Sequence, residues 1–368
     1  MKKGYYLQAE SRVSLGVSNK IDMQLREFNK YFDFEEIEIP TPKRTLLQRV
    51  IGLFPTASIK RDYEYVLNKM EAPDYIYIRR FVADKKYICF LKKIKELYPE
   101  CKILVEVFTY PYDKDDFGKW NAWPFLIKEL IYRKKQKKYI DRFVTFTPDE
   151  EIFGIKAIST FNGIDVDSIK MAEGQFSNKE IHLMGVAYMQ RHHGYERLIK
   201  GLADYYSKLN VDTEVFLDLV GDGPEKEMYQ NLVNECNLSK YVTFYPNTNG
   251  DELDKLFDKC DIAVSSLGLY KLGLLGKAGV LKSREYLARG LMMLLGSEID
   301  ILDDDYIYAI MFDNDDSIID IKRVVEFYKN MTDRYSDKQV LAQTIREFAY
   351  ETVDNSVTMR PIIDYLRG

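Results

Sequence analysis

The chain has 368 residues, of which 46% are hydrophobic and 30% are charged, and its formal net charge is -5. This length exceeds what one hydrophobic core usually organises, so we expect two folded domains. The four cysteines are widely spaced with no Cys-x-x-Cys pair, and there are three histidines, which argues against a zinc site, a disulfide framework and a serine–histidine hydrolase.

The charge is distributed unevenly along the chain. Residues 1–165 carry a net charge of +6 and residues 166–368 a net charge of -11. A basic half joined to an acidic half predicts different partners for the two halves, although a drift of surface charge without function is the alternative. No apolar run is long enough to span a membrane, and the amino terminus lacks the apolar core of a signal peptide, so we expect a cytoplasmic protein.

Short runs rich in Val, Ile and aromatic residues alternate with helix-like segments through the first half. Such runs are typical of buried parallel strands. Strands are predicted at Tyr5–Leu7, Phe34–Ile39, Tyr75–Ile78, Ile103–Phe108, Phe143–Phe146 and Ala157–Ser159. Helices are predicted at Lys20–Tyr31, Lys85–Tyr98 and Leu126–Tyr139. The alternation predicts an α/β layered domain.

A second alternation follows the turn at Asn162-Gly-Ile-Asp165 and the polar, linker-like segment Val166–Lys179. Its strands are predicted at Ile181–Val186, Val215–Val220, Val242–Tyr245, Ile262–Ser265, Met292–Leu295 and Tyr306–Phe312. Its helices are predicted at Tyr195–Leu209, Glu225–Cys236, Gly250–Lys259, Lys282–Ala288 and Asp316–Asn330. The tail is helical in pattern and is interrupted near Val353–Ser356.

These two alternations predict two Rossmann-like, doubly wound domains that face one another across a cleft. Ligands of such domains bind beyond the carboxyl ends of the strands. We expect a first domain at residues 1–165 and a second at residues 166–335. Residues 336–368 are expected to form helices that cross back to the first domain.

The stretch Lys277–Gly290 joins a small-residue turn to a helix that carries one acidic residue, Glu285. Backbone amides and the helix dipole at about residues 279–282 would attract an anion such as a diphosphate. Lys282 lies at the start of this helix and is a candidate phosphate ligand. Glu285, one turn further on, could accept hydrogen bonds from the hydroxyls of a ribose. This arrangement favours nucleotide-sugar chemistry.

A second loop, Leu219-Val-Gly-Asp-Gly-Pro-Glu225, ends a predicted strand and could border a nucleotide pocket. An ordinary tight turn between a strand and a helix has the same residues. A Gly-x-Gly-x-x-Gly dinucleotide fingerprint that starts at Gly221 would need its third glycine where this chain has Lys226, which argues against hydride transfer.

Three further residues are candidates for phosphate contact. Gly16 follows the first strand and could let the backbone approach a diphosphate, although a loop glycine without function is the alternative. Arg191 and His193, in the loop between Gly185 and Gly194, could reach a phosphate, although the loop could also be a solvated basic surface.

Two basic segments predict peripheral contact with anionic lipid. Lys43–Arg61 mixes cations with large apolar residues, and Lys128–Arg142 contains Arg133-Lys-Lys-Gln-Lys-Lys138. Solvated helix faces are the alternative. No nucleic-acid recognition module accompanies these cations, so no nucleic-acid partner is expected.

Five motifs of the second half occur in one order over about 110 residues. They are Gly185, Gly194-x-x-x-Leu-Ile, Leu219-Val-Gly-Asp-Gly-Pro-Glu225, Lys259-Cys-Asp-Ile262 and Glu285-Tyr-Leu-Ala-Arg-Gly290. With these motifs the second half resembles the nucleotide-binding domain of glycosyltransferase family 4, a group of retaining enzymes with the two-domain GT-B architecture. Thr109-Tyr-Pro-Tyr-Asp113 and Ser265-Ser-Leu-Gly268 resemble segments of members that build bacterial surface polysaccharides.

The resemblance implies a GT-B glycosyltransferase that moves a sugar from a nucleotide-diphosphate sugar to a saccharide or lipid-linked saccharide acceptor. A UDP- or GDP-sugar is the expected donor, bound by the second domain without a metal or other cofactor, and the first domain is expected to bind the acceptor. Retention of anomeric configuration and a role in surface polysaccharide biosynthesis are further expectations. The protein is expected in the cytoplasm, peripherally at the inner face of the cell membrane.

The resemblance also assigns residues. Glu285 would bind the donor ribose, the amides of Gly279, Val280 and Leu281 would bind the diphosphate, and Gly16 would lie in the donor-facing glycine loop of the first domain. Independently of the resemblance, the charges of Lys282 and Arg191, with the helix dipole, could stabilise the leaving diphosphate.

The chain departs from the family pattern at three positions. Lys277 stands where the family has a glutamate that contacts the donor sugar, and Val186 and His193 replace an arginine and a lysine. These departures motivate the alternative of a non-catalytic nucleotide-sugar-binding or assembly partner with the same fold.

Overall fold

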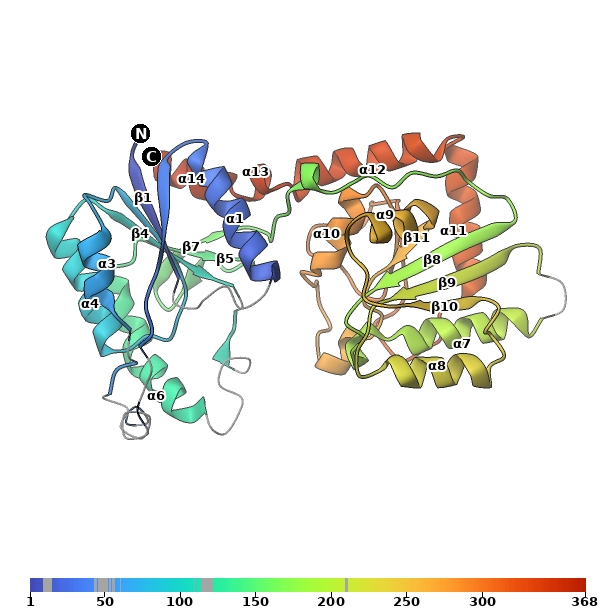
Figure 1. Cartoon of the computed structure of the whole chain (residues 1–368), viewed down its shortest axis with the longest axis horizontal. Coiled ribbons are helices and arrows are strands. Elements are labelled where there is room, and N and C mark those ends of the chain that lie inside the picture. The colour runs from blue at the N-terminus through green and yellow to red at the C-terminus, as the bar shows by residue number, and fades with distance from the viewer. Residues whose placement is uncertain are drawn as a thin grey trace. The chain divides into compact units, whose positions relative to one another are not determined.

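The computed structural model describes residues 1–8, 15–42, 45, 52, 54, 57–59, 61–108, 110–113, 122–208 and 211–368. Contacts divide the chain into two compact units (Figure 1). Unit 1 consists of Met1–Gly163 together with Asn355–Gly368, and unit 2 consists of Ile164–Asp354. Each unit is a layered α/β structure around a largely parallel sheet, so the predicted fold class is confirmed.

The sheet of unit 1 has the strand order β2-β1-β3-β4-β5-β7-β6. Its strands are parallel except for the antiparallel pair of β6 and β7. The strands are β1 (Lys3–Gln8), β2 (Asp33–Glu38), β3 (Tyr75–Arg79), β4 (Lys102–Val107), β5 (Arg142–Thr145), β6 (Glu151–Ile152) and β7 (Ile155–Ser159).

Side chains of the central strands alternate between two hydrophobic clusters, one on each face of this sheet. On β3, Tyr75 and Tyr77 join one cluster, whereas Ile76 and Ile78 join the other. The first face is covered by α1 (Leu15–Asn29) and α14 (Arg360–Arg367), and the second by α3 (Tyr63–Lys69), α4 (Lys85–Leu97) and α6 (Trp123–Tyr132). Strands buried on both faces need apolar residues at successive positions, which is why these runs could be recognised in the sequence.

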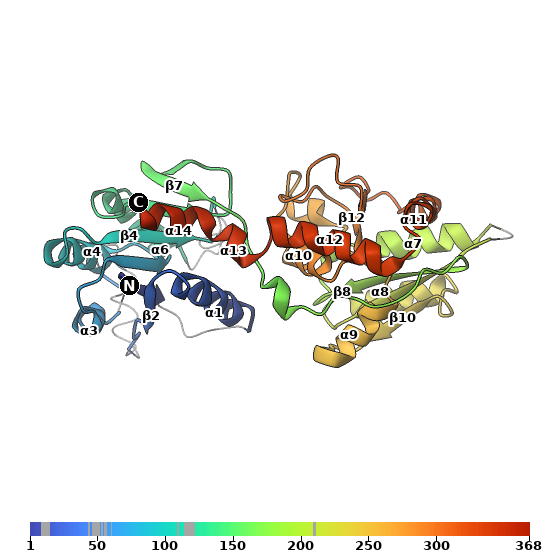
Figure 2. The ribbon, with the colours of Figure 1, turned by 90° about the horizontal axis from the view of Figure 1, so that it is seen from above.

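The C-terminal helices α13 (Asn355–Thr358) and α14 belong to unit 1, whereas the preceding α12 (Lys338–Thr352) belongs to unit 2 (Figure 2). Tyr75 donates a hydrogen bond of 2.7 Å from its hydroxyl to the carbonyl of Leu366. Lys102 donates one of 3.0 Å from Nζ to the carbonyl of Tyr365. The end of the chain is therefore bound to the sheet of unit 1 by both packing and polar contacts.

The sheet of unit 2 has the order β10-β9-β8-β11-β12-β13, and all of its pairs are parallel. Its strands are β8 (Glu180–Val186), β9 (Glu214–Val220), β10 (Val242–Tyr245), β11 (Ile262–Val264), β12 (Met292–Leu295) and β13 (Ala309–Met311). Its helices are α7 (Tyr195–Tyr206), α8 (Lys226–Glu235), α9 (Gly250–Lys259), α10 (Leu281–Ala288), α11 (Ile321–Arg334) and α12. Helix α7 packs beside α8 and α11, and α10 packs beside α12.

The predicted strands of both halves are present, but several elements differ from the prediction. The helix predicted at Leu126–Tyr139 is α6 followed by a 3-10 turn, η2 (Arg133–Lys138). The strand predicted at Tyr306–Phe312 is reduced to β13, and the helix predicted from Asp316 begins only at Ile321. Helix α3 and the short strand β6 had no counterpart in the prediction.

A buried carboxylate organises the interior of unit 1. Glu106, on β4, accepts hydrogen bonds from Gln24 Nε2 at 2.7 Å and from Tyr77 Oη at 2.8 Å. Its other oxygen lies 3.3 Å from Lys20 Nζ and 3.6 Å from Arg79 Nη1. Burial opposes ionisation of Glu106, but the two cations and the two hydrogen bonds outweigh it, so the pKa of this carboxyl is lowered from its ordinary value.

Replacement of Glu106 by glutamine tests this network. The substitution removes the charge that compensates Lys20 and Arg79. Because their side chains stay 20% and 16% exposed, we expect a cost of about 2–3 kcal/mol, below the roughly 3–5 kcal/mol for fully buried pairs. We expect Glu106→Gln to lower the free energy of unfolding by this smaller amount in urea titrations at pH 7. The matched control is Glu35→Gln, since Glu35 forms an ion pair with Lys3 on the surface and should cost less than about 1 kcal/mol. Equal effects of the two substitutions would contradict this account.

Candidate functional site

Three loops of unit 2 meet where β8, β9 and β11 end. The amide of Met189 donates to the carbonyl of Asp222 at 2.5 Å, which joins the loops after β8 and β9. The amide of Leu267 donates to the carbonyl of His193 at 2.8 Å, which joins the loops after β8 and β11. This edge is where ligands of doubly wound sheets bind.

Glycines allow these loops to approach one another. Gly194 has a φ of 64°, and a Cβ there would lie 2.7 Å from the amide nitrogen of Gly268. Gly221 has a φ of 128°, and a Cβ there would lie 2.0 Å from the carbonyl oxygen of Ala187. A larger residue at either position would strain the backbone and push the loops apart. The glycine motifs therefore have a defined structural role in shaping this edge.

Helix α10 follows the loop after β11 and begins at the same edge. Its N-cap residue, Val280, offers no side-chain acceptor, so no side chain caps the first backbone N–H groups of the helix; that of Ser283 donates to the carbonyl of Val280 at 3.1 Å. Ser283, in the first turn, shares a hydrogen bond of 3.1 Å with Ser265 at the end of β11. The amides of the first turn are thus held at the carboxyl end of the sheet, as an anion site requires.

Lys282 is the cation of this site. Its Nζ lies 3.4 Å from the hydroxyl of Tyr195 and 5.8 Å from the centre of the same ring. Within the part of the chain that the structure describes, Lys282 forms no ion pair with a carboxylate. Burial without a compensating charge lowers the pKa of Lys282 to about 7. An anionic ligand would supply the charge that this lysine lacks.

Two histidines lie close enough to Lys282 to be affected by its charge. Burial, followed by the charges of Lys282 and His192, lowers the pKa of His193 to about 3. His193 is therefore neutral at physiological pH. Its Nδ1 accepts a hydrogen bond of 3.0 Å from the amide of Gln190, which places the ring proton on Nε2. His193 can donate a hydrogen bond to a ligand but contributes no positive charge.

Glu285 lies one turn after Lys282 on α10 and is partly exposed. Its Oε1 accepts a hydrogen bond of 3.0 Å from Arg289 Nε, and Arg289 also donates one of 2.7 Å to Asp254. Arg289 therefore holds the Glu285 carboxylate in place from one side. Because 37% of the Glu285 side chain stays exposed, the carboxylate can still accept hydrogen bonds from a ligand.

A buried ion pair supports the turn before α10. Arg284 Nη2 contacts both carboxylate oxygens of Asp300, at 2.8 and 2.7 Å, and Nη1 donates to the carbonyl of Val280 at 3.0 Å. Gly279 adjoins this pair, since a Cβ at Gly279 would lie 3.2 Å from Asp300 Oδ2. Lys277 is exposed, and its Nζ donates to the carbonyl of Leu302 at 3.4 Å.

The structure brings Lys282, His193 and the turn at residues 279–281 together, with Glu285 on the same helix. Arg191 is exposed in the 3-10 turn η4 (Arg191–His193). Gly16 lies in the first turn of α1 in unit 1, not in a loop before the helix, because α1 begins at Leu15. Most of the predicted lipid-contacting segment Lys43–Arg61 falls outside the described residues.

The sequence interpretation missed Tyr195 and Arg289, which hold Lys282 and Glu285. Tyr195 is fully buried, and a Cβ at Gly185 would lie 2.8 Å from its ring. Both residues lie inside motifs that the sequence analysis singled out for their glycines and apolar residues. The sequence signals that could have revealed them are a tyrosine next to Gly194 and an arginine one helical turn after Glu285.

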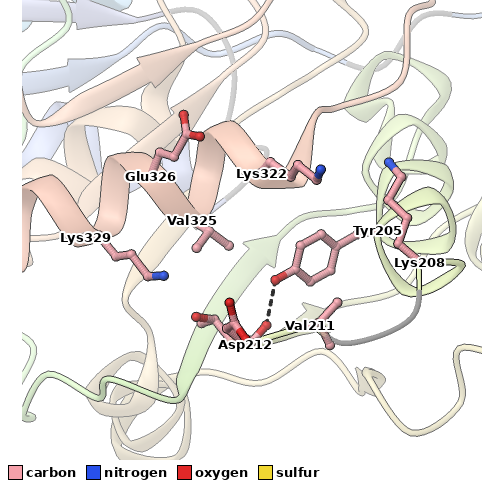
Figure 3. A pocket seen from close by; sticks show the side chains of 9 residues that line it. Tyr205, Lys208, Val211, Asp212, Lys322, Val325, Glu326 and Lys329 are labelled. Carbon is pink, nitrogen blue, oxygen red and sulfur yellow. Dashed lines mark hydrogen bonds between the residues drawn. The ribbon is translucent and has the colours of Figure 1, made fainter.

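A pocket elsewhere in unit 2 differs from this site in its charges. The pocket, of about 370 Å³, lies between α7, α11 and the residues that precede β9 (Figure 3). Lys208, Lys322 and Lys329 surround it, but Asp212 and Glu326 lie among them, and Lys208 pairs with Asp204. The pocket is at the amino end of β9, so it is separate from the site at the carboxyl ends of the strands.

In the described residues, no group of three or more His, Cys, Asp or Glu side chains is arranged to hold a metal ion. No described helix combines the length and the apolar composition that would let it cross a membrane.

Residues 167–274 match the family model described as glycosyl transferases group 1. This segment covers much of unit 2, including the loops after β8, β9 and β11. No curated protein matched the chain.

Solved structures share the architecture of the whole chain. A glycosyltransferase from Rickettsia africae superposes with a TM-score of 0.60 at 12% identity, covering 100% of this chain and 98% of that one. Sucrose-phosphate synthase from Thermosynechococcus elongatus gives 0.60 at 12% identity, with 100% and 99% covered. The lipopolysaccharide outer core galactosyltransferase WaaB gives 0.54 at 11% identity, with 100% and 99% covered. These likenesses establish the GT-B fold.

The depressed pKa of Lys282 predicts a stability that depends on pH. Between the folded-state pKa of about 7 and the ordinary value of 10.5, the unfolded chain binds the additional proton, so this lysine makes stability rise with pH across that window. We expect Lys282→Met to be more stable than the wild type at pH 7, by roughly 4 kcal/mol. The difference should shrink as the pH rises toward 9 in urea titrations. Lys200→Met, at an exposed position of α7, is the control and should show no such trend. A constant difference for Lys282→Met at all pH values would contradict the assignment.

Proposed function

We propose that this chain, whose residues 167–274 match the group 1 glycosyltransferase model, transfers a sugar from a nucleotide-diphosphate sugar to a saccharide acceptor. In this proposal unit 2 binds the donor, as a UDP- or GDP-sugar, and unit 1 binds the acceptor. Neither a metal ion nor another cofactor takes part.

The observation that carries the proposal is the uncompensated cation at the start of α10. Lys282 has no carboxylate partner in the described chain and lies beside uncapped helix amides and the neutral donor His193. A diphosphate satisfies all three groups, because it supplies negative charge for Lys282 and acceptor oxygens for the amides and for His193 Nε2. A neutral ligand would leave the lysine charge uncompensated.

The same groups can stabilise the transition state. As the bond from the anomeric carbon to the diphosphate oxygen breaks, negative charge grows on the diphosphate, next to Lys282 and the α10 dipole. The acceptor hydroxyl forms the new bond to the anomeric carbon, and its proton passes to the departing phosphate oxygen. Attack from the face that the diphosphate leaves yields retention of configuration and needs no separate nucleophile on the protein.

Glu285 accounts for recognition of the nucleoside. It lies one helical turn from Lys282, which suits a ribose attached to a diphosphate bound at the helix start. Arg289 orients the carboxylate, so less side-chain freedom is lost when the ribose hydroxyls bind. Arg191, exposed two residues before His193, is the second cation proposed to reach the diphosphate.

For the acceptor we propose a lipid-linked saccharide, in the synthesis of a bacterial surface polysaccharide. The motifs at residues 109–113 and 265–268 support this class, and a solved structure with the same fold is a lipopolysaccharide core galactosyltransferase. A lipid-linked acceptor would bring the protein to the membrane surface, in agreement with the basic character of residues 1–165.

A second candidate function is nucleotide-sugar binding without catalysis. Lys277 favours it, since a cation stands where the related glycosyltransferases place the glutamate that contacts the donor sugar. Turnover separates the two functions. Calorimetry that detects donor binding, with no sugar transfer across a broad set of saccharide acceptors, would favour the binding protein.

Replacement of Glu285 tests the donor site. Loss of the hydrogen bonds that the ribose hydroxyls donate to the Glu285 carboxylate costs roughly 1.5–3 kcal/mol, so Glu285→Ala should weaken donor binding about 10- to 100-fold. The measurement is a titration of UDP- and GDP-sugars, followed by assay of sugar transfer. Glu252→Ala, which removes an exposed glutamate of α9, is the control and should leave both unchanged. Full donor affinity and activity in Glu285→Ala would overturn the assignment of this residue.

A further inference from the structure

Helix α6 of unit 1 has apolar side chains on two faces: Phe125, Leu126 and Tyr132 pack on the core of the unit, and a second apolar face is exposed. Trp123, Leu130 and Ile131 are 48%, 49% and 42% exposed, respectively, and Ile127 is half-buried. These four residues fall at positions i, i+4, i+7 and i+8, so they share one face of the helix. In a surface helix that only packs against its own sheet, this face would be polar.

The polar residues of α6 are instead buried and satisfied. Lys128 is fully buried and donates a hydrogen bond of 2.7 Å from Nζ to the carbonyl of Gly52. Glu129 accepts hydrogen bonds from the hydroxyl of Tyr112 at 2.7 Å and from the amide of Ala83 at 2.6 Å. These partners fix the rotation of the helix about its axis, so the exposed apolar face is a stable feature of the fold.

A basic segment follows the apolar face directly. Lys134, Lys135, Lys137 and Lys138 are all exposed in η2, and none forms an ion pair within the described part of the chain. Arg133 differs, because it pairs with Asp113 at 2.9 Å. Residues 123–142 contain seven Lys or Arg and two Asp or Glu. The surface formed by Trp123, Ile127, Leu130, Ile131 and the four lysines is called the α6 surface below.

The chemistry of the α6 surface selects its partner. Tryptophan favours the boundary between acyl chains and headgroups, leucine and isoleucine favour the acyl chains, and unpaired lysines favour anionic headgroups. A second copy of the chain fits less well, since a two-fold contact through this face would bring the two lysine runs together.

We propose that the α6 surface docks on an anionic lipid bilayer, with the apolar face entering the headgroup boundary and the lysines of η2 contacting acidic headgroups. The inference rests on the membrane contact in the proposed function and names the element that makes it. It does not involve the donor site, which belongs to unit 2. Docking by unit 1 would present that unit to an acceptor carried on lipid.

Vesicle sedimentation tests the proposal with the full-length protein. We expect binding to phosphatidylcholine vesicles that contain 30% phosphatidylglycerol, weaker binding as salt is raised, and little binding to phosphatidylcholine alone. Each lysine near an anionic surface changes affinity about fivefold, so Lys134→Glu/Lys138→Glu should bind the anionic vesicles more than about tenfold more weakly. Trp123→Ser/Leu130→Ser should lose a similar factor.

Matched controls come from α4 in the same unit. Lys85→Glu/Lys86→Glu makes the same change in net charge at exposed positions, and Leu97→Ser removes a leucine that is 48% exposed. Both should bind vesicles within about twofold of the wild type. Equal losses in the α4 and α6 variants, or no binding of the wild type to anionic vesicles, would overturn the proposal. So would a wild-type dimer that Trp123→Ser/Leu130→Ser converts to a monomer.

A titration of UDP with every variant separates this proposal from the donor site. Loss of vesicle binding with unchanged UDP affinity supports the α6 surface. Vesicle binding by a wild-type protein that binds neither UDP nor GDP would count against the donor site and leave the α6 surface supported.

Discussion

The donor site proposed in unit 2 depends on one electrostatic constraint, a lysine held in a partly buried position without a counter-charge. Lys282 is kept there by α10 and by contact with Tyr195, and burial alone lowers its pKa to about 7. Such a lysine lowers the stability of the free protein, because burial disfavours its charged form. The arrangement becomes favourable when an anion completes it, which is why the site is best understood as one half of a complex with a diphosphate.

The surrounding structure brings this lysine to the right place. The loops after β8, β9 and β11 approach closely because Gly194 and Gly221 lack side chains, and the Arg284–Asp300 pair supports the turn that begins α10. In unit 1 the buried Glu106 has the opposite character, since Lys20 and Arg79 compensate its charge. Neighbouring side chains thus balance the charge of Glu106, whereas the charge of Lys282 is available to a ligand.

Much of the fold could be predicted from the sequence, because strands buried on both faces leave continuous apolar runs such as Ile103–Phe108. Motif spacing predicted one helix start, since residues 279–281, Lys282 and Glu285 do lie at the start of α10; their binding roles stay a proposal. The neutral state of His193 and the bracing of Glu285 by Arg289 could not be predicted, because they depend on burial and on hydrogen bonds between segments far apart in the chain. The exposed apolar face of helix α6 was also difficult to predict. Apolar periodicity shows that a helix has an apolar face but not whether that face points inward.

The measurement that tests the central claim most directly is the proton balance of UDP binding, by calorimetry at pH 8 in buffers of different ionisation enthalpy. A diphosphate beside Lys282 raises its pKa, so the lysine, largely neutral at pH 8 in the free protein, must take up a proton on binding. The account predicts uptake of close to one proton per UDP by the wild type and none by Lys282→Met. Binding of UDP without proton uptake, or equal uptake in both proteins, would contradict it.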